Sequence, residues 1–186
     1  MQIKFNAPVT LGFSLVCTVV FVLNVILMQS ILPFFTIYDS IQWTNPFSIA
    51  TLFTHAIGHG SIEHLLGNLT FILLLGPIIE EKYGSSNLLL MMLITALITG
   101  ILNITFFNTG LMGASGIVFM MILLVSFTNV KAGQIPVSFI LVALLFIGKE
   151  LLNSLENNQI SEMAHIIGGI CGSIFGFILS SGRSII

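Results

Sequence analysis

Charged side chains are scarce in this chain. Asp, Glu, Lys and Arg make up 6% of its 186 residues, whereas a soluble domain carries roughly a quarter. Residues 5–38, 83–130 and 163–182 contain none at all, and 56% of the chain is hydrophobic. Uncharged stretches of this length exceed the helices of a soluble core. The scarcity of charge therefore excludes an ordinary soluble domain and predicts an all-α protein that crosses a membrane several times.

Basic clusters and a metal-binding set of cysteines are also lacking. The net charge is −2 and no run of Lys or Arg occurs, which argues against binding to nucleic acid or strong attraction to anionic lipid. Cys17 and Cys171 both fall in apolar segments, where cysteine behaves as a small hydrophobic residue. We therefore expect these cysteines to form neither a disulfide nor a metal-binding pair.

The apolar segments number six, and a helix needs about 20 mostly apolar residues to cross a bilayer. The predicted spans are 9–31, 62–79, 86–107, 115–128, 136–152 and 162–180. The fourth is short, and the polar, glycine-containing residues 108–113 before it predict a loop that starts this helix below the membrane surface. The long aromatic connection 32–61 suits the membrane interface. Without an internal repeat, residues 1–186 are predicted to form one six-helix domain.

The positive charges predict how the spans are oriented. With a cytoplasmic amino terminus, four of the five cations lie on the inner side and Lys149 lies near the outer end of the fifth span. The four are Lys4, Lys82, Lys131 and Arg183. Cytoplasmic loops are enriched in Lys and Arg, so both termini are predicted to be cytoplasmic.

Four polar side chains lie near the starts of the even-numbered spans. His64 and Asn68 lie in the second span, Ser115 starts the fourth, and His165 lies near the start of the sixth. At about 1.5 Å rise per residue, each lies within roughly 9 Å of its helix start. Polar residues in the apolar zone are costly and usually mark a functional site. We therefore expect one site that opens to the outer side.

Ser115 has the surroundings of a nucleophile. It follows Gly113 and precedes Gly116, and such small neighbours let a substrate backbone approach. They also leave amides free at a helix start, where the nucleophile's own N–H can help to hold an oxyanion. A serine hydroxyl needs a base to take its proton.

His165 is the candidate base, because a histidine pKa suits proton transfer near neutrality. It is followed by a stripe of small residues on one helical face, Gly168, Gly172 and Gly176. Stripes of this kind let membrane helices pack with close backbones. Packing of the stripe on the fourth span would bring His165 within reach of Ser115.

His64 and Asn68 lie four residues apart on one helical face, and both can donate hydrogen bonds to a negative oxygen. With the Ser115 amide they are predicted to form an oxyanion hole. No acid is clearly placed as a third triad member: Asp39 is the only Asp, and Glu162 lies at the interface. A dyad is the simpler interpretation. On the third span, Thr99 and Asn103 are candidates for holding water.

Each of these residues also has an interpretation without catalysis. A serine in a small-residue helix start is structural in most proteins, and the glycine stripe is a packing device. Packing or an interfacial position accounts for His55 and His59 equally well. A metalloprotease is disfavoured because the histidines between positions 55 and 64 match neither His-Glu-x-x-His nor His-x-x-Glu-His. A transporter is disfavoured because repeats and paired broken helices are absent from the sequence.

Several motifs occur together along the chain: Phe53-Thr54-His55 with His59, His64 and Asn68; the turn at 80–85; Gly113 to Gly116; and Ala164-His165 with Gly168 and Gly172. In this combination the chain resembles the rhomboid family of intramembrane serine proteases, from about Leu52 to the end of the sixth span.

The resemblance implies a six-helix core without metal or cofactor, and single-pass membrane proteins as substrates. It implies Ser115 as nucleophile, His165 as base, and His64, Asn68 and the Ser115 amide as the oxyanion hole. The weaker candidates for supporting roles are Gly113, Gly116, Phe119, Gly168, Gly172, His55 and Asn103. By analogy, a chain this short suggests a monomeric enzyme of a bacterial inner membrane.

Two departures from the family pattern stand out. Many members carry a Trp-Arg pair shortly before the second helix, whereas residues 48–52 read Ser-Ile-Ala-Thr-Leu here. Phe119 stands four residues after Ser115, where the family often has Tyr, and it can still stack on His165. A non-catalytic rhomboid-like protein that binds membrane helices is the alternative function, although such relatives typically lack the dyad.

Overall fold

The computed structural model describes residues 5–38, 40–107, 110–128, 134–153 and 162–180, and every regular element in these ranges is a helix. The prediction of an all-α protein is confirmed. The elements in chain order are α1 (Pro8–Ile26), the 3-10 helix η1 (Leu32–Phe35), α2 (Pro46–Thr54), α3 (Ile62–Tyr83), α4 (Ser85–Phe106), α5 (Ser115–Val125), α6 (Val137–Asn153) and α7 (Glu162–Ser180).

Four helices among the described residues are long and apolar enough to cross a membrane: α1, α3, α4 and α7. The apolar α5 has 11 residues and α6 has 17. Large apolar side chains are exposed on the surface of the bundle, for example Leu74 on α3 and Leu144 on α6, where lipid rather than water suits them. The chain is a multi-pass membrane protein, and the number of six spans stays a prediction.

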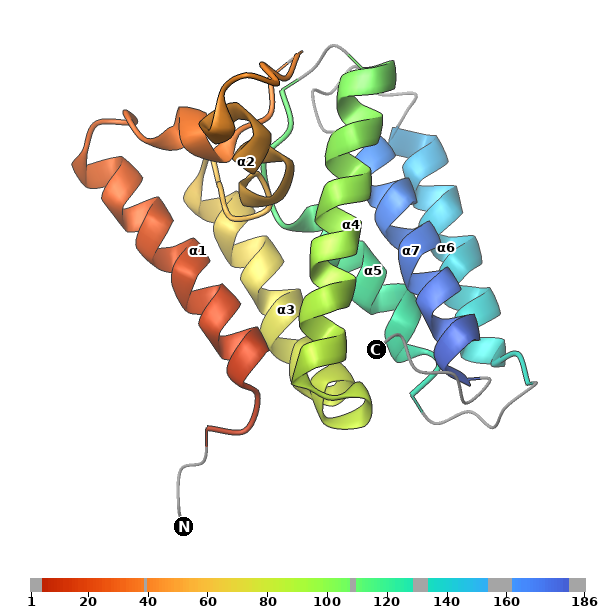
Figure 1. Cartoon of the computed structure of the whole chain (residues 1–186). Helices are drawn as coiled ribbons and strands as arrows, with labels where there is room; N and C mark the ends of the chain where they lie inside the picture. Colours follow the sequence, from red (N-terminus) through yellow and green to blue (C-terminus); the bar gives the residue numbers. More distant parts are fainter. Residues whose placement is uncertain (1–4, 39, 108–109, 129–133, 154–161, 181–186) are drawn as a thin grey trace.

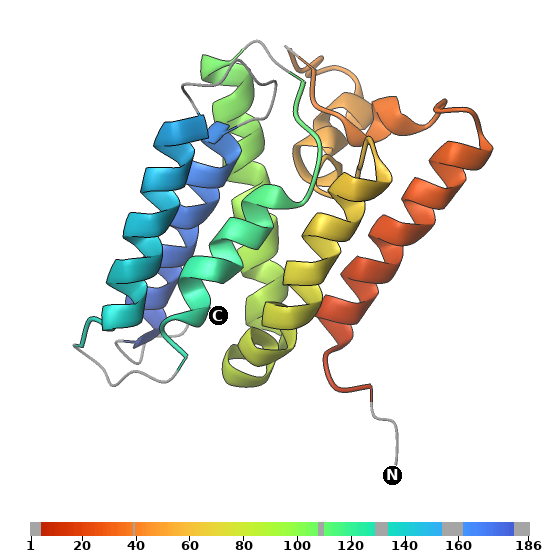
Figure 2. The same cartoon turned by 180° about the vertical axis from the view of Figure 1, so that it is seen from behind.

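Short α5 lies in the middle of the bundle. It packs against α3 on one side and against α7 on the other, while α4 packs on α3, α5 and α7. The outermost helices are α1 and α6, which lie at opposite sides of the molecule in both views (Figures 1 and 2). Because α5 begins part-way along the bundle (Figure 2), its first turn is surrounded by other helices.

The first helix ends earlier than the predicted span 9–31, at Ile26. The cause is the side chain of Asn24, which is 1% exposed. Its Nδ2 donates to Gln29 Oε1 at 2.7 Å, and its Oδ1 accepts the Leu32 N–H at 3.0 Å. Gln29 has a φ of 67°, a left-handed conformation typical of helix ends. Hydropathy misplaced the end because apolar residues continue into this turn.

The aromatic connection between the first two predicted spans contains two short helices that the sequence analysis did not predict, η1 and α2. Asn45 begins α2, since its Oδ1 accepts the Phe47 N–H at 3.0 Å and Pro46 follows as the first helical residue. Trp43 and Phe47 are exposed, and aromatic rings are enriched at membrane interfaces. Both short helices lie at the end of the bundle where α1 finishes (Figure 1).

Glycine lets α5 and α7 approach to backbone contact. A Cβ added to Gly168 would overlap the carbonyl of Gly116, and one added to Gly172 would overlap that of Met120. A Cβ on Gly176 would meet the ring of Phe127. The stripe of small residues after His165 therefore packs along α5.

A buried carboxylate joins the start of α1 to the end of α3. Glu80 is 4% exposed and accepts four hydrogen bonds. Its oxygens accept the backbone N–H groups of Val9 and Thr10, each at 2.9 Å, and the hydroxyls of Thr10 and Ser85, each at 2.7 Å. No side chain of α1 caps that helix, so Glu80 supplies the cap and a negative charge at its positive end.

Several residues used to predict orientation and a third catalytic acid lie outside the described residues. They are Lys4, Asp39, Lys131 and Arg183, together with the side chains of Lys149 and Glu162. Lys82, at the exposed end of α3, is described. The beginning of α1 and the end of α7 lie at the same end of the bundle (Figure 1).

Candidate active site

A cavity of about 1240 Å³ lies among α3, α5, α6, α7 and residues 110–112. Ser115, His165, His64 and Asn68 all line it. The rest of its wall is mainly apolar, and Glu63 is the one charged residue among the described residues that line it. A volume of this size exceeds what a drug-sized ligand needs.

Ser115 is the first residue of α5 and is half-buried at the cavity. The preceding residue, Ala114, makes no side-chain cap, and the first amides of a helix have no acceptor within the helix. Ser115 therefore lies at the positive end of the α5 helix dipole. The position suits a group on which negative charge develops.

His165 comes from α7 and lines the same cavity as Ser115, near a close glycine contact between the two helices. A Cβ built on Gly116 would lie 3.3 Å from the carbonyl oxygen of Ala164. Ser115 directly precedes Gly116, and His165 directly follows Ala164. The two candidate residues therefore flank a close backbone contact between α5 and α7. The ring of Phe119 lies over the imidazole of His165, with centroids 4.3 Å apart and planes tilted by 36°. Phe119 thus makes the stacking contact expected of it.

Gly113 is a position that only glycine can occupy without strain. Its φ is 115°, and a Cβ there would lie 2.5 Å from Nε2 of His64 and 3.7 Å from Nδ2 of Asn68. The glycine backbone therefore lies tightly against the His64 ring and close to the Asn68 amide. Its N–H donates to the carbonyl of His55 at 2.8 Å, and this hydrogen bond fixes the loop that leads into Ser115.

His55 lies under this loop and does not line the cavity. Its side chain is 2% exposed, with Nδ1 3.0 Å from the carbonyl of Thr51 and Nε2 3.5 Å from the Thr99 hydroxyl. Burial lowers the pKa of His55 to about 4, although its backbone hydrogen bonds oppose the shift. Asn103 is likewise buried and away from the cavity wall. Of the two, His55 contacts the loop before Ser115, through the hydrogen bond from the Gly113 N–H to its carbonyl.

His59 is the site residue that sequence reasoning left undecided. It is 1% exposed, and its Nε2 lies 3.0 Å from Nδ2 of Asn68. Its ring also meets that of His64 edge to face, with centroids 5.0 Å apart. Burial is the main cause, and the neighbouring His64 a smaller one, of a His59 pKa lowered to about 4. His59 contacts both predicted oxyanion donors while remaining neutral at pH 7.

The match to known proteins agrees with this geometry. Residues 46–182, from the start of α2 to beyond the end of α7, match the family described as the rhomboid domain. The chain belongs to the rhomboid family. A relative named rhomboid protease GlpG, from Haemophilus influenzae, is 30% identical over 133 residues, which cover 70% of this chain and 69% of the relative.

The part of this rhomboid chain that matches the family contains every residue of the candidate site, whereas α1 lies before it. Glu80 helps to attach α1 to the matched part, because its carboxylate accepts hydrogen bonds from the backbone N–H groups of Val9 and Thr10. No group of three His, Cys, Asp or Glu side chains that could hold a metal occurs among the described residues.

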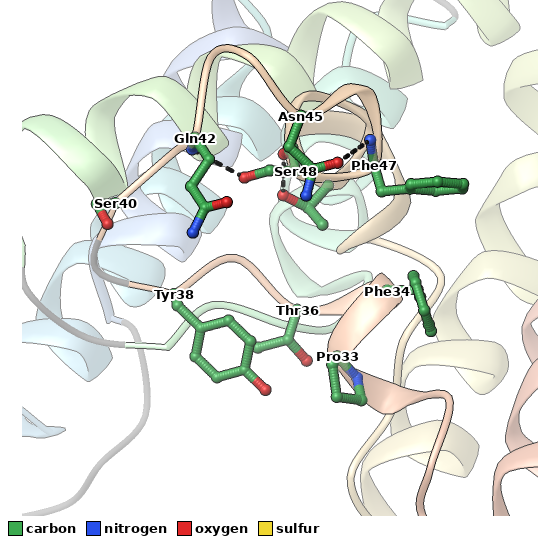
Figure 3. A pocket seen from close by; sticks show the side chains of 10 residues that line it. Pro33, Phe34, Thr36, Tyr38, Ser40, Gln42, Asn45, Phe47 and Ser48 are labelled. Atoms are coloured by element: carbon green, nitrogen blue, oxygen red, sulfur yellow. Dashed lines mark hydrogen bonds between the residues drawn. The ribbon is translucent and has the colours of Figure 1, made fainter.

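A second, smaller cavity of about 310 Å³ lies between η1, α2 and the chain that joins them (Figure 3). Its polar lining includes Ser40, Gln42, Asn45 and Ser48. The Ser48 hydroxyl accepts the Gln42 N–H at 3.0 Å, and the described residues that line this cavity include neither a histidine nor a charged residue. The larger cavity, which Ser115 and His165 both line, is therefore the candidate active site.

Proposed function

We propose that this chain is an intramembrane serine endopeptidase that cleaves single-pass membrane proteins by a Ser115/His165 dyad. The observation that carries the proposal is the common cavity: Ser115, His165, His64 and Asn68 come from three helices and line one space. Membership of the rhomboid family and the named protease among its relatives support the same conclusion.

In the first half of the reaction, His165 takes the hydroxyl proton of Ser115 while the serine oxygen attacks the scissile carbonyl carbon. The resulting oxyanion accepts hydrogen bonds from the side chains of His64 and Asn68 and from the amide of Ser115. The C–N bond then breaks, and the protonated His165 gives its proton to the leaving amine.

In the second half, water enters the cavity and His165 takes one of its protons. The hydroxide attacks the acyl-enzyme, the bond to the serine oxygen breaks, and the proton returns to that oxygen. Phe119 keeps the imidazole in place through both halves, because its ring lies over that of His165. We further propose that the cavity opens to the outer side of a bacterial inner membrane, with both termini cytoplasmic.

The test is cleavage of a single-span substrate that carries a small residue near the outer membrane boundary, by protein reconstituted in liposomes. Ser115→Ala and His165→Ala are expected to lower the rate by about 10⁴-fold or more, and a chelator to change nothing. Ser173→Ala is the matched control, since this α7 hydroxyl only donates to the carbonyl of Gly169. Equal activity of Ser115→Ala and wild type would overturn the proposal.

A serine-directed phosphonate gives an independent readout. Labelling of the wild type at Ser115, and none in Ser115→Ala, is expected. If the wild type neither cleaves several such substrates nor takes up the label, the non-catalytic helix-binding function replaces the protease.

A further inference from the structure

One hydrogen bond connects the loop before α3 to the interior of that helix. His59 Nε2 lies 3.0 Å from Asn68 Nδ2, and His59 Nδ1 lies 3.0 Å from the carbonyl oxygen of Ile57. A carbonyl oxygen can only accept, so Nδ1 carries the proton of the ring and Nε2 carries a lone pair. Asn68 therefore donates one of its two amide N–H bonds to His59, and the other remains for the cavity that Asn68 lines.

We propose that His59 is a positioning residue, which holds the Asn68 amide so that an N–H and not the carbonyl oxygen faces the oxyanion; this rests on the protease function proposed above. The oxygen and nitrogen of an asparagine amide have nearly the same size, so shape alone does not choose between the two orientations. The orientations have opposite electrostatic effects. An N–H stabilises a developing negative oxygen, whereas a carbonyl oxygen repels it.

His59 removes this ambiguity because its lone pair accepts only a donor. In the flipped orientation the Asn68 oxygen would face the Nε2 lone pair across 3.0 Å, and two acceptors would meet in a buried place. His59 is 1% exposed and Asn68 is 6% exposed, so water offers little relief. Unpaired buried polar atoms are costly, and this cost keeps the donor orientation.

The arrangement needs a neutral imidazole, because a protonated ring has no lone pair at Nε2. Burial and the adjacent His64 keep the pKa of His59 near 4. The acceptor is therefore present at neutral pH without a carboxylate to fix the tautomer. The Ile57 carbonyl performs that task.

Two substitutions separate the acceptor from the rest of the side chain. His59→Asn can keep a donor for the Ile57 carbonyl but has no atom in the place of Nε2. His59→Gln carries an oxygen that reaches the place of Nε2 and can accept from Asn68. We expect His59→Asn to lower kcat about 10- to 100-fold with KM within about twofold. His59→Gln is expected to recover kcat to within about fivefold of wild type.

A double-mutant cycle with Asn68→Ala distinguishes positioning from a general structural role. If His59 acts through Asn68, His59→Asn changes kcat by less than about twofold in the Asn68→Ala background. An equal loss of kcat in both backgrounds, or equal activity of His59→Asn and wild type, would overturn the proposal.

The nitrogen resonances of the histidine rings test the hydrogen bond without relying on activity. We expect His59 to be neutral with its proton on Nδ1, and its Nε2 resonance to shift in Asn68→Ala. A proton on Nε2 would overturn the positioning role even in an active enzyme. The expected tautomer in a wild type without cleavage or phosphonate labelling would instead contradict the protease function while leaving the bond itself established.

Discussion

The two ends of α3 each hold a buried polar cluster, and the clusters differ in one respect. At the end of the helix, Glu80 accepts four hydrogen bonds from α1 and from the first residue of α4. At the beginning, Asn68 is bonded to His59 on one side and faces a cavity on the other. The cluster at Glu80 is complete, whereas the one at Asn68 has a donor left over.

This difference distinguishes a cluster that stabilises the fold from one that serves the function. Buried polar groups are nearly always paired, because an unpaired one costs about 1 to 3 kcal/mol. A cluster whose partners all come from the protein stabilises the fold, as Glu80 does by joining α1 to α3. An amide N–H that faces an open cavity needs a hydrogen-bond acceptor from outside the protein. We therefore expect changes at the two ends of α3 to affect different measurements.

The largest expected effect is on stability, at the Glu80 end. Glu80→Ala leaves two backbone N–H groups and two hydroxyls without their acceptor, and is expected to lower the free energy of unfolding by about 4 kcal/mol. The thermal midpoint in detergent measures this loss. Glu81→Ala is the matched control, because that neighbouring side chain is exposed and should change stability by about 0.5 kcal/mol or less. Similar losses in the two variants would contradict the role of Glu80.

The next effect is on catalysis, at the other end. Asn68→Ala removes a predicted oxyanion donor and is expected to lower kcat about 10²- to 10³-fold, which corresponds to roughly 3 to 4 kcal/mol of transition-state stabilisation. The thermal midpoint should stay close to that of wild type. Asn87→Ala provides a comparison, since its side chain only donates to the Tyr83 carbonyl at 2.8 Å, away from the cavity. If Asn68→Ala lowered the thermal midpoint but not kcat, Asn68 would be a structural residue and its predicted catalytic role would be wrong.

A pair of glycines sharpens the comparison. Gly84, next to the Glu80 cluster, and Gly113, next to Asn68, both have positive φ, 85° and 115°. Alanine at either position should cost about 1 to 3 kcal/mol of stability through backbone strain. A Cβ on Gly84 meets nothing within 4 Å, whereas one on Gly113 meets the His64 ring. Only Gly113→Ala is therefore expected to lower kcat, by about 10-fold or more, and equal kcat values would show that the His64 ring tolerates displacement.

The smallest effect is a pH dependence at the beginning of α3. The pKa of His55 and of His59 is lowered by burial from 6.5 to about 4, so the unfolded chain binds more protons than the folded one between these values. Stability is therefore complete above about pH 6.5 and falls as the pH drops towards 4. Between about pH 7 and about pH 5.5 we expect a loss of roughly 1 kcal/mol for each histidine. The thermal midpoint of His59→Asn should fall less steeply with pH than that of wild type, and parallel curves would contradict the buried neutral state.

Much of the fold follows from local composition. The predicted spans agree with α3, α4, α6 and α7 to within a few residues, because an apolar segment between polar turns has few alternatives in a bilayer. The end of α1 did not follow, because the side-chain bonds of Asn24 to Gln29 and Leu32 close a turn inside an apolar run. Without such contacts in view, hydropathy extends the helix too far.

The candidate site shows the same division. Residue types and spacing were enough to select Ser115, His165, His64 and Asn68, and these four side chains line one cavity. The role of His59 could not be predicted from residue type and spacing. Its bond to Asn68 crosses from a loop into a helix, and the choice between packing and positioning depends on where that loop lies.

By itself the sequence determined the helical membrane architecture and the chemistry available to the site, since both depend on which residue types occur and how they are spaced. Only the tertiary structure decided that Gly113 lies against the His64 ring, that His59 is hydrogen-bonded to Asn68, and that Glu80 caps α1. The physical reason is that burial depends mainly on composition and has no direction. A hydrogen bond or a backbone contact, in contrast, requires two particular atoms to meet at a suitable distance and angle.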